Sequence, residues 1–369
     1  MTLDTAVLTD LLEPPPGTRP DPDAFVRAAM DWHFDPATGS PFWLNRARTL
    51  DFDPRRDVRT LADLALFPNV SGELRKAPVA DLVPRGYGEH PDVVGVFESG
   101  GTTGVPKRVV LLRDWLERML ARSNAALDEH GFPRGTDWLG LVPTGPHIVG
   151  EFFRRSAATF GRHGFAVDLD PRWVKRCIAQ GDGDRAAEYA EHVIDQAADV
   201  LRSQDIGVMT ITPPLLERLA RREELVDLVN EKVRAIRWGG TQMDADSRHL
   251  YRTEIFPDTV LAGNYGSTMI VGFAGERPGL SDDDPCVFDT LGPHVTFDVV
   301  DPETREPVGP GERGRVVAHH VSRSFLLPNN LERDLATRVA PPEGGYGDSV
   351  ADIAPVATFE SETVIEGVY

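Results

Sequence analysis

Lysine and cysteine are scarce in this chain of 369 residues. Four lysines are present, and none follows residue 232: Lys76, Lys107, Lys175 and Lys232. A reaction step that requires a lysine therefore has few candidates. The two cysteines, Cys177 and Cys286, are too few for a disulfide framework or a zinc cluster, and too far apart for a CxxC motif. This cysteine usage fits a reducing compartment.

Targeting and membrane segments are also missing from the pattern. The first residues contain no basic stretch followed by an apolar run, so we expect no signal peptide. No run approaches the roughly 20 apolar residues of a membrane helix, so we expect a cytoplasmic protein without a membrane partner. Acidic residues outnumber basic ones by 58 to 39, giving a formal charge of −19. This excess argues against a nucleic-acid partner, because phosphate backbones bind basic surfaces, but it permits a small anion in a local pocket.

The apolar residues, 41% of the chain, are sufficient for a sizeable core, and the sequence divides into three parts. Residues 1–90 are Pro-rich and irregular, with helices expected at 22–31 and 59–66. In residues 91–284, strands alternate with helices. Residues 285–369 are β-rich and include an expected hairpin, while the last thirty residues are acidic and poorly patterned.

The middle part has the clearest periodicity. Strands are expected at 93–97, 108–112, 138–142, 165–169, 206–212, 235–240 and 260–268. Helices are expected at 114–129, 147–160, 184–203, from 213 onwards, and at 244–255. Such alternation predicts an α/β fold of layered, mostly parallel sheets flanked by helices, followed by a small β-rich subdomain in which 295–301 pairs with 314–321.

The sharpest motif is SGGTTGVPK, which runs from Ser99 to Lys107 between two expected strands. Its glycines permit close backbone approaches, Ser99, Thr102 and Thr103 supply hydroxyl groups, and Lys107 supplies a point charge. Together with exposed N–H groups, these residues predict a loop that wraps a phosphate. The motif is not a Walker A loop, in which GK[ST] opens a helix, because a strand follows the lysine here.

This loop resembles the [ST]SG[ST]TGxPK motif of the acyl-adenylate-forming (AMP-binding) enzymes, with Gly101 at a usual Ser/Thr position. The family includes acyl-CoA ligases, luciferases and peptide-synthetase adenylation domains. Further segments resemble the family in the same order: TPPLLERL (212–219), WGGT (238–241), NYGST (264–268), GPGERGRV (309–316) and LERDLA (331–336). The resemblance covers about 93–355. It implies the large N-terminal domain of that fold, with a distorted β-barrel subdomain and without the family's mobile C-terminal domain.

The resemblance implies a nucleotide site for ATP. Tyr265 would stack on adenine, Thr268 would contact the α-phosphate, and Asp334 would accept hydrogen bonds from the ribose hydroxyls, with Asp348 and Asp352 as rivals. The implied cofactor-binding residues are Ser99, Gly100, Gly101, Thr102, Thr103, Gly104, Lys107, Gly239, Gly240, Thr241, Asn264, Tyr265, Gly266, Ser267, Thr268 and Asp334. The implied catalytic residues are Lys107, His147 and Thr268, and the implied substrate contacts are His147, Gly239 and Gly240.

His147 follows an expected strand in the segment PTGPHIVG (143–150). In the family, this region closes over the carboxylate of the substrate, which implies a gate or a carboxylate contact. A structural histidine is the alternative. The Gly-Pro-His segment also resembles the phenylacetate-CoA-ligase-like subgroup that acts in phenazine antibiotic biosynthesis.

The sequence departs from the family in two places. Met269 stands where the family has a glutamate that binds Mg²⁺, and a thioether is a poor ligand for a hard cation. The ion would then depend on ATP, water and a displaced carboxylate such as Glu276, so its ligand stays open. The family's C-terminal domain also carries a catalytic lysine. Arg333 or Arg338 would be the substitute within this chain, or a partner protein would supply that domain.

Other chemical interpretations are weaker. The adjacent His319 and His320 would point to opposite faces of a strand, so a metal pair is not expected. The aspartates at 282–284 lack the other ligands of a calcium loop. Asn69-Val70-Ser71 forms a glycosylation triplet by chance. No GxSxG motif supports a serine hydrolase.

Two functions from different classes therefore remain. The first is an enzyme, an acid-activating ligase that converts ATP and an aromatic carboxylic acid into acyl-AMP and pyrophosphate. The subgroup resemblance implies a phenazine carboxylate in antibiotic biosynthesis, and the missing lysine domain implies slow turnover. The alternative is a protein that binds nucleotide or acyl-adenylate without turnover. The identity of the acyl acceptor is not readable from the sequence.

Overall fold

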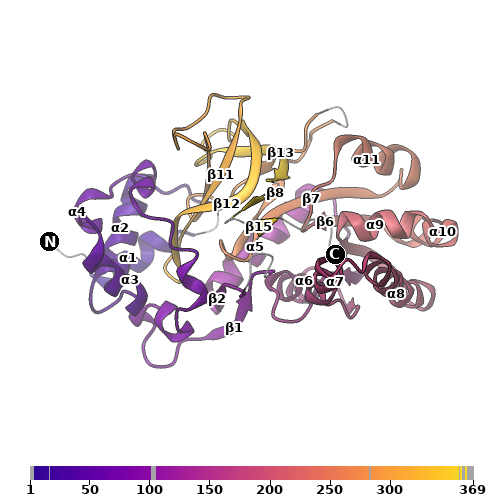
Figure 1. Cartoon of the computed structure of the whole chain (residues 1–369), viewed down its shortest axis with the longest axis horizontal. Helices are drawn as coiled ribbons and strands as arrows, with labels where there is room; N and C mark the ends of the chain where they lie inside the picture. The colour runs from indigo at the N-terminus through magenta and orange to yellow at the C-terminus, as the bar shows by residue number, and fades with distance from the viewer. Residues whose placement is uncertain are drawn as a thin grey trace.

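The computed structural model describes residues 4–15, 17–100, 105–281, 284–356, 358–359 and 362–363. Helices of the N-terminal part gather at one end of the molecule, and the helices between residues 183 and 250 lie at the other end (Figure 1). One sheet of eleven strands connects the two ends, with the strand order β10-β11-β12-β13-β9-β8-β7-β6-β5-β3-β4.

Proline begins most of the N-terminal helices, because its missing N–H and fixed φ suit the first helical position. An aspartate or serine directly before each of these prolines caps the helix through its side-chain oxygen. The α-helices here are α1 (Thr5–Leu12), α2 (Pro22–Phe34), α3 (Pro41–Arg46) and α4 (Pro54–Asp57). Short 3₁₀ helices follow at Ala47–Thr49, Ala62–Leu66, Glu73–Arg75, Val79–Leu82 and Arg85–Tyr87.

The helix expected at 22–31 is confirmed, and the one expected at 59–66 is present in a shorter and tighter form. The segment forms a 3₁₀ helix at Ala62–Leu66. Oδ2 of Asp63 accepts hydrogen bonds from the backbone N–H and the hydroxyl of Thr60, at 2.8 and 2.9 Å. These local bonds hold a tight turn at the beginning of the segment, so that the helix starts later than expected.

The parallel half of the sheet carries the alternation predicted from the sequence. Its strands are β3 (Asp137–Leu141), β4 (Gly164–Ala166), β5 (Ile206–Ile211), β6 (Ala235–Gly239) and β7 (Val260–Ser267). Its helices are α5 (Arg113–Glu129), α6 (Ile148–Thr159), α7 (Pro171–Ala179), α8 (Gly183–Ser203), α9 (Pro213–Ala220), α10 (Glu223–Lys232) and α11 (Ala245–Leu250). The α/β fold is thus confirmed, although the helix expected at 244–255 changes at Tyr251–Ile255 into a π-helical turn.

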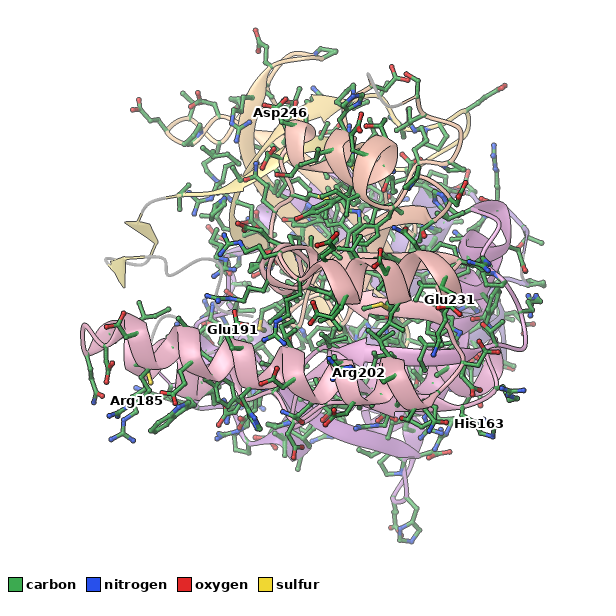
Figure 2. The ribbon with its side chains drawn as sticks, turned by 90° about the vertical axis from the view of Figure 1, so that its right-hand side faces the viewer. His163, Arg185, Glu191, Arg202, Glu231 and Asp246 are labelled. Carbon is green, nitrogen blue, oxygen red and sulfur yellow. The ribbon has the colours of Figure 1, made fainter. Side chains whose placement is uncertain are left out.

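Helix α8 shows why these helices cover the sheet. Val193, Ile194, Ala197 and Leu201 are fully buried along one side of the helix, and each large apolar side chain stabilises the fold by about 2 kcal/mol. The opposite side is charged, and Figure 2 shows Arg185, Glu191 and Arg202 along this helix. Ion pairs from Glu191 to arginines of α9 and of the α9–α10 turn tie these helices together.

The antiparallel half continues the same sheet beyond β7, so the β-rich part is joined to the parallel strands by hydrogen bonds. Its strands are β8 (Gly272–Glu276), β9 (Phe288–Asp289), β10 (Val295–Val300), β11 (Arg313–Val321), β12 (Leu326–Val339) and β13 (Ser349–Pro355). A further two-residue pair is formed by β14 (Thr358–Phe359) and β15 (Glu362–Thr363). The expected hairpin of 295–301 with 314–321 is confirmed as β10 and β11.

The long strand β12 and its neighbour β13 are not evident from the sequence. β12 contains the polar stretch PNNLERD, and β13 lies within the acidic tail that we expected to be poorly patterned. The polar side chains of β12 lie along a cavity, so the strand lacks the alternation that marks a half-buried strand.

The expected pair of strands around the phosphate motif forms a separate antiparallel hairpin. It consists of β1 (Val93–Glu98) and β2 (Arg108–Leu112). In Figure 1 the hairpin lies between the N-terminal helices and the helices of the parallel half. No helix among the described residues has both the length and the apolar composition needed to cross a membrane.

Candidate active site

A cavity of about 490 Å³ opens where the β1–β2 hairpin, the carboxyl ends of the parallel strands and β12 meet. This edge of a parallel sheet is where α/β proteins commonly bind ligands. Thirteen of the residues that the sequence nominated line this cavity: Ser99, Gly100, Lys107, His147, Gly239, Gly240, Thr241, Asn264, Tyr265, Gly266, Ser267, Thr268 and Asp334. Gly101, Thr102, Thr103 and Gly104 lie outside the described residues.

The two ends of the phosphate motif are held against each other. The backbone N–H of Ser99 donates to the carbonyl of Lys107 at 2.9 Å, and the N–H of Lys107 donates to Oγ of Ser99 at 3.0 Å. Glu98, directly before the motif, pairs with Arg108 of β2 at 3.0 Å and also with Arg172 of α7. These hydrogen bonds hold the two ends of the loop together, and the ion pair of Glu98 with Arg172 connects them to α7.

The side chain of Lys107 is buried and oriented by a residue that the sequence did not nominate. Its Nζ donates to Oγ of Ser71 at 3.3 Å, and Ser71 itself is 1% exposed. Ser71 is the last residue of the Asn69-Val70-Ser71 triplet. Because the residue is buried, its hydroxyl makes a contact inside the protein and not at the surface. Lys107 also acts electrostatically on Glu332, because its charge lowers the pKa of that carboxyl.

Two carboxylates of β12 face the same cavity at alternate positions of the strand. Oδ2 of Asp334 accepts a hydrogen bond from the phenol of Tyr265 at 3.0 Å. Oε1 of Glu332 accepts from the hydroxyl of Ser267 and from the amide of Asn330, both at 2.8 Å. Burial, reinforced by the negative charge of Asp334, raises the pKa of Glu332 to about 7. Burial also raises the pKa of Asp334, against the opposing charge of Arg333.

The rivals of Asp334 differ in position. Asp348 lies away from the cavity lining, where its carboxylate accepts from the N–H of Val299 at 3.0 Å and pairs with Arg338 at 2.8 Å. Arg338 is therefore engaged in the fold and does not line the cavity, whereas Arg333 does. Asp352 lines the cavity, with its carboxylate bonded to the hydroxyl of Thr337 at 3.0 Å.

The carboxylates available to a divalent cation also differ from the expectation. Met269 is buried, and Glu276 does not line the cavity because it pairs with Arg252 at 2.7 Å and accepts from the N–H of Gly263 at 2.6 Å. Within the described residues, no group of three or more His, Cys, Asp or Glu side chains forms a metal cluster. Glu332 lies in the cavity and offers the hard oxygen atoms that Mg²⁺ prefers, so it fits as a partial ligand.

Two titratable side chains from separate elements, His147 and Lys175, also line the cavity. Burial, together with the charges of Arg172 and Lys175, lowers the pKa of His147 to about 4, so its imidazole is neutral at pH 7. Nζ of Lys175, on α7, donates to the carbonyl of Gly100 at 2.8 Å. Burial, together with the charges of Arg333 and Arg172, lowers the pKa of Lys175 to about 8. Lys175 is not among the site residues expected from the sequence, although it is one of the four lysines of the chain.

The Gly-Gly turn after β6 adopts a conformation that needs glycine. Gly240 has φ +87°, and a Cβ there would lie 3.4 Å from Cγ2 of Thr212. The hydroxyl oxygens of Thr212 and Thr241 are buried beside this turn, and neither has a hydrogen-bond partner in the part of the chain that the structure describes. Buried polar atoms without partners are uncommon in folded proteins, and here they line a cavity that a polar ligand would fill.

An aromatic wall lies on the α6 side of the cavity. Phe152 and Phe153 come from α6, and Phe273 comes from β8. The rings of Phe152 and Phe273 meet edge to face, with centroids 5.9 Å apart. Apolar periodicity predicts that such residues are buried, but it does not tell a cavity wall from a filled core. The sequence therefore did not nominate them.

The weaker chemical interpretations also have structural answers. Nε2 of His319 bonds to Asp298 at 3.0 Å, whereas His320 bonds to the carbonyl of Ile270 from the other face of the strand. The two histidines therefore do not face a common site. Cys286 lines the cavity, but burial raises the pKa of its thiol, which disfavours the reactive thiolate.

Known structures share this architecture. An open conformation of 2-hydroxyisobutyryl-CoA ligase, in complex with 2-HIB-AMP and CoA, superposes with a TM-score of 0.60 at 14% identity over 97% of this chain and 80% of the other. The same ligase in its postadenylation state gives 0.62 at 15%, over 97% and 73%. ATP-bound MatB from Rhodopseudomonas palustris gives 0.47 at 19%, over 72% of this chain, which spans about half (49%) of the length of MatB.

No family model matches the sequence, and no curated protein matches it. At identities of 14 and 15%, the likeness to the CoA ligase concerns the fold, and it extends over nearly the whole chain. The chain has the fold of the large N-terminal domain of the acyl-adenylate-forming ligases.

Proposed function

We propose that this chain is an acid-activating ligase that forms an acyl-adenylate from ATP and an aromatic carboxylic acid. One observation carries the proposal: the described ends of the phosphate motif, the Tyr265–Asp334 pair and the aromatic wall of Phe152, Phe153 and Phe273 line the same cavity. A nucleotide and an acid bound there would be neighbours, and holding reactants side by side is a large part of catalysis.

Positively charged side chains support phosphate binding on the side of the cavity that the β1–β2 hairpin forms. Although the whole chain has a formal charge of −19, Lys107, Lys175 and Arg333 all line this cavity. We propose that Ser99, Gly100 and the loop to Gly104 bind the triphosphate through N–H and hydroxyl groups, while Lys107 neutralises its charge. Lys175 supplies a second ammonium, and it fills the role for which the sequence suggested an arginine.

The nucleoside would occupy the side formed by β6, β7 and β12. Tyr265 packs its ring on adenine, and the backbone of Gly239 and Gly240 lies along the base. Asp334 accepts hydrogen bonds from the ribose hydroxyls, and its bond from Tyr265 orients the carboxylate. The remaining contacts come from polar and small residues of the same turns: Thr241, Asn264, Gly266 and Ser267.

The reaction needs no proton transfer. One carboxylate oxygen of the acid forms a bond to the α-phosphorus of ATP, the bond from that phosphorus to the bridging oxygen breaks, and pyrophosphate leaves. Thr268 contacts the α-phosphate, and the neutral imidazole of His147 donates to the acid without forming a competing ion pair. Lys107 and Lys175 stabilise the negative charge that builds on the phosphate oxygens.

Mg²⁺ fits this scheme as a neutralising ion of the phosphates. Glu332 would hold it, since Met269 has no oxygen ligand and Glu276 is engaged with Arg252. When the ion is absent, protonation of Glu332 near pH 7 relieves the repulsion with Asp334.

We propose an aromatic acid because three phenylalanines surround the acid side of the cavity. The resemblance of the Gly-Pro-His segment to the phenazine subgroup supports a phenazine carboxylate and a role in antibiotic biosynthesis. A second candidate, binding of nucleotide or acyl-adenylate without turnover, is favoured by Met269 at the position of the family's glutamate.

Acid-dependent exchange of labelled pyrophosphate into ATP decides between these candidates. We expect exchange with at least one aromatic acid in a panel of one-, two- and three-ring monocarboxylates and dicarboxylates. We also expect it to fall at least tenfold in Lys107→Met. Exchange that is absent for the whole panel, in a protein that binds ATP by calorimetry, would establish the non-catalytic candidate instead.

A further inference from the structure

The cavity has a polar floor that the adenylation chemistry does not use. Gly140, Thr210, Arg237 and Ala262 occupy neighbouring register positions of β3, β5, β6 and β7, so their side chains project from one face of the sheet. Thr210 and Arg237 line the cavity and lie side by side in this row. We call the pair the Thr210–Arg237 floor.

The floor lies deeper than the nucleotide-binding turn. Thr210 and Arg237 precede Thr212 and Gly239 by two residues each, which corresponds to about 7 Å along a strand. The next row in the same direction, Trp138, Val208 and Ala235, is fully buried and apolar. The floor is therefore the inner end of the cavity, beyond which the hydrophobic core begins.

Arg237 is a buried cation without an acidic partner in the described part of the chain. The residue is 9% exposed, and burial lowers the pKa of its guanidinium to about 10. Its Nη2 donates to Oδ1 of Asn264 at 3.1 Å, and its guanidinium lies 5.0 Å from the ring centroid of Phe273. A guanidinium carries five N–H donors, so most of its donor capacity remains for a ligand.

Thr210 provides an independent observation. Its hydroxyl oxygen is buried and has no hydrogen-bond partner among the described residues, and the residue is 8% exposed. An apolar residue would fill a strand interior better, because a buried hydroxyl without a hydrogen bond destabilises the folded chain. A desolvated cation and an unsatisfied hydroxyl side by side are both costs to stability that a bound anionic group would remove.

The surroundings fix where that group would be. Phe153 packs on Gly140, where a Cβ would come within 2.6 Å of its ring, and Phe152 and Phe273 belong to the same aromatic wall. An aromatic ring packed on this wall would present one end to the phosphate side and the other to the floor. The end at the floor must carry charge to satisfy Arg237.

We propose that the acid is a dicarboxylate, whose second carboxylate binds the Thr210–Arg237 floor while the first one is activated. This inference rests on the proposed function only for the identity of the reacting end. The guanidinium donates to the second carboxylate, and the Thr210 hydroxyl donates to one of its oxygens. The floor thereby selects substrates by charge at the end remote from the reaction.

Measuring the binding of candidate acids tests the inference, because binding does not require catalytic turnover. Calorimetry at pH 8 compares benzoate, isophthalate and monomethyl isophthalate, and the matched naphthalene set of 2-naphthoate, naphthalene-2,6-dicarboxylate and its monomethyl ester. In at least one set we expect the diacid to bind at least tenfold more tightly than both relatives. Arg237→Met should abolish this preference, Arg237→Lys should retain part of it, and Thr210→Val should reduce it about threefold.

The control is Arg234→Met, which removes an arginine that is exposed three residues earlier and does not line the cavity. Its preference should equal that of the wild type, and thermal melting should show Arg237→Met to be folded. An ester that binds as tightly as its diacid would show that the floor takes a neutral acceptor and overturn the inference. An equal loss of mono- and diacid in Arg237→Met would assign Arg237 to the reacting carboxylate and also overturn it.

The experiments distinguish a failure of the proposed ligase function from a failure of the proposed dicarboxylate site. A diacid preference that depends on Arg237, in a protein without pyrophosphate exchange, would support the floor and reject the ligase. Exchange with monoacids and no diacid preference would support the ligase and reject the floor. Absence of binding by all six acids also rejects the floor.

Discussion

The phenol of Tyr265 and the carboxylate of Asp334 are joined by a hydrogen bond of 3.0 Å across the cavity wall, between β7 and β12. Phe288 and Phe297 hold the tyrosine ring, at centroid distances of 6.2 and 5.5 Å. The residues expected at the base and at the ribose therefore form one unit, and the tyrosine fixes the direction of the carboxylate.

This unit predicts how the chain distinguishes ribose from its deoxy analogues. Asp334→Asn should bind ATP about tenfold more weakly than the wild type, because a charged acceptor for the ribose hydroxyls is lost. It should also no longer prefer ATP over 3′-deoxy-ATP. Calorimetry with both nucleotides measures the effect, and Asp352→Asn is the matched control at the cavity margin. A preference that follows Asp352 would reassign the ribose contact.

Lys107 predicts a phosphate-specific loss. Lys107→Met should weaken ATP binding by ten- to one-hundredfold, as expected for loss of a charge-assisted hydrogen bond. Binding of adenosine should change less than threefold. Ser71→Ala should produce a smaller loss of ATP binding, because the hydroxyl positions Nζ. Lys76→Met serves as the control, since this lysine is exposed and does not line the cavity. Equal losses for ATP and adenosine would contradict the phosphate role.

Glu332 predicts a pH-dependent stability. Because its folded-state pKa of about 7 lies above the ordinary value of 4.5, its stabilising contribution is present below pH 4.5 and lost as the pH rises through 7. Glu332→Gln should therefore melt about 3 °C higher than the wild type at pH 8, equivalent to about 2 kcal/mol, with no gain at pH 5. The same variant should show a weaker dependence of ATP affinity on Mg²⁺. A melting difference independent of pH would argue against a titrating Glu332.

Three buried histidines predict that the stability of the fold decreases as the pH falls, which is opposite to the pH dependence that Glu332 produces. Burial lowers the pKa of His33 to about 4 and those of His294 and His320 to about 3, so the unfolded chain takes up protons first as the pH falls below 6.5. Each should cost about 2 kcal/mol of stability at pH 4.5, and together about half of a typical folding free energy. Thermal melting between pH 7 and 4.5 should fall by several degrees, and less steeply in His294→Gln. An unchanged slope in that variant would show that His294 does not contribute.

The fold was largely predictable because the parallel half carries strong periodic signals. β5, with every residue from Ile206 to Ile211 buried, and the amphipathic α8 are read directly from apolar spacing. β12 was not predicted, because its Asn330, Glu332 and Asp334 face a cavity and break the alternation of a strand. Local turn bonds, such as those of Asp63, likewise override helical spacing.

Some residues of the candidate site could likewise be predicted from the sequence, and others could not. Residues within continuous motifs, such as Lys107 and Tyr265, could be nominated because their order along the chain is informative. Ser71, Lys175 and Arg237 could not, because each comes from a different part of the chain, and only the tertiary fold brings Ser71 to Lys107 and the other two side chains to the cavity. In the sequence Arg237 resembles any other arginine, and only its burial in β6, beside Thr210 of β5, marks it as a candidate site residue.

A crystal structure of the chain with a non-hydrolysable ATP analogue would locate the nucleotide. We expect density for the triphosphate against the turn from Ser99 to Lys107, adenine against Tyr265 and the ribose hydroxyls at Asp334. Density for the nucleotide at another place, with this cavity free of it, would show that the cavity is not the ATP site.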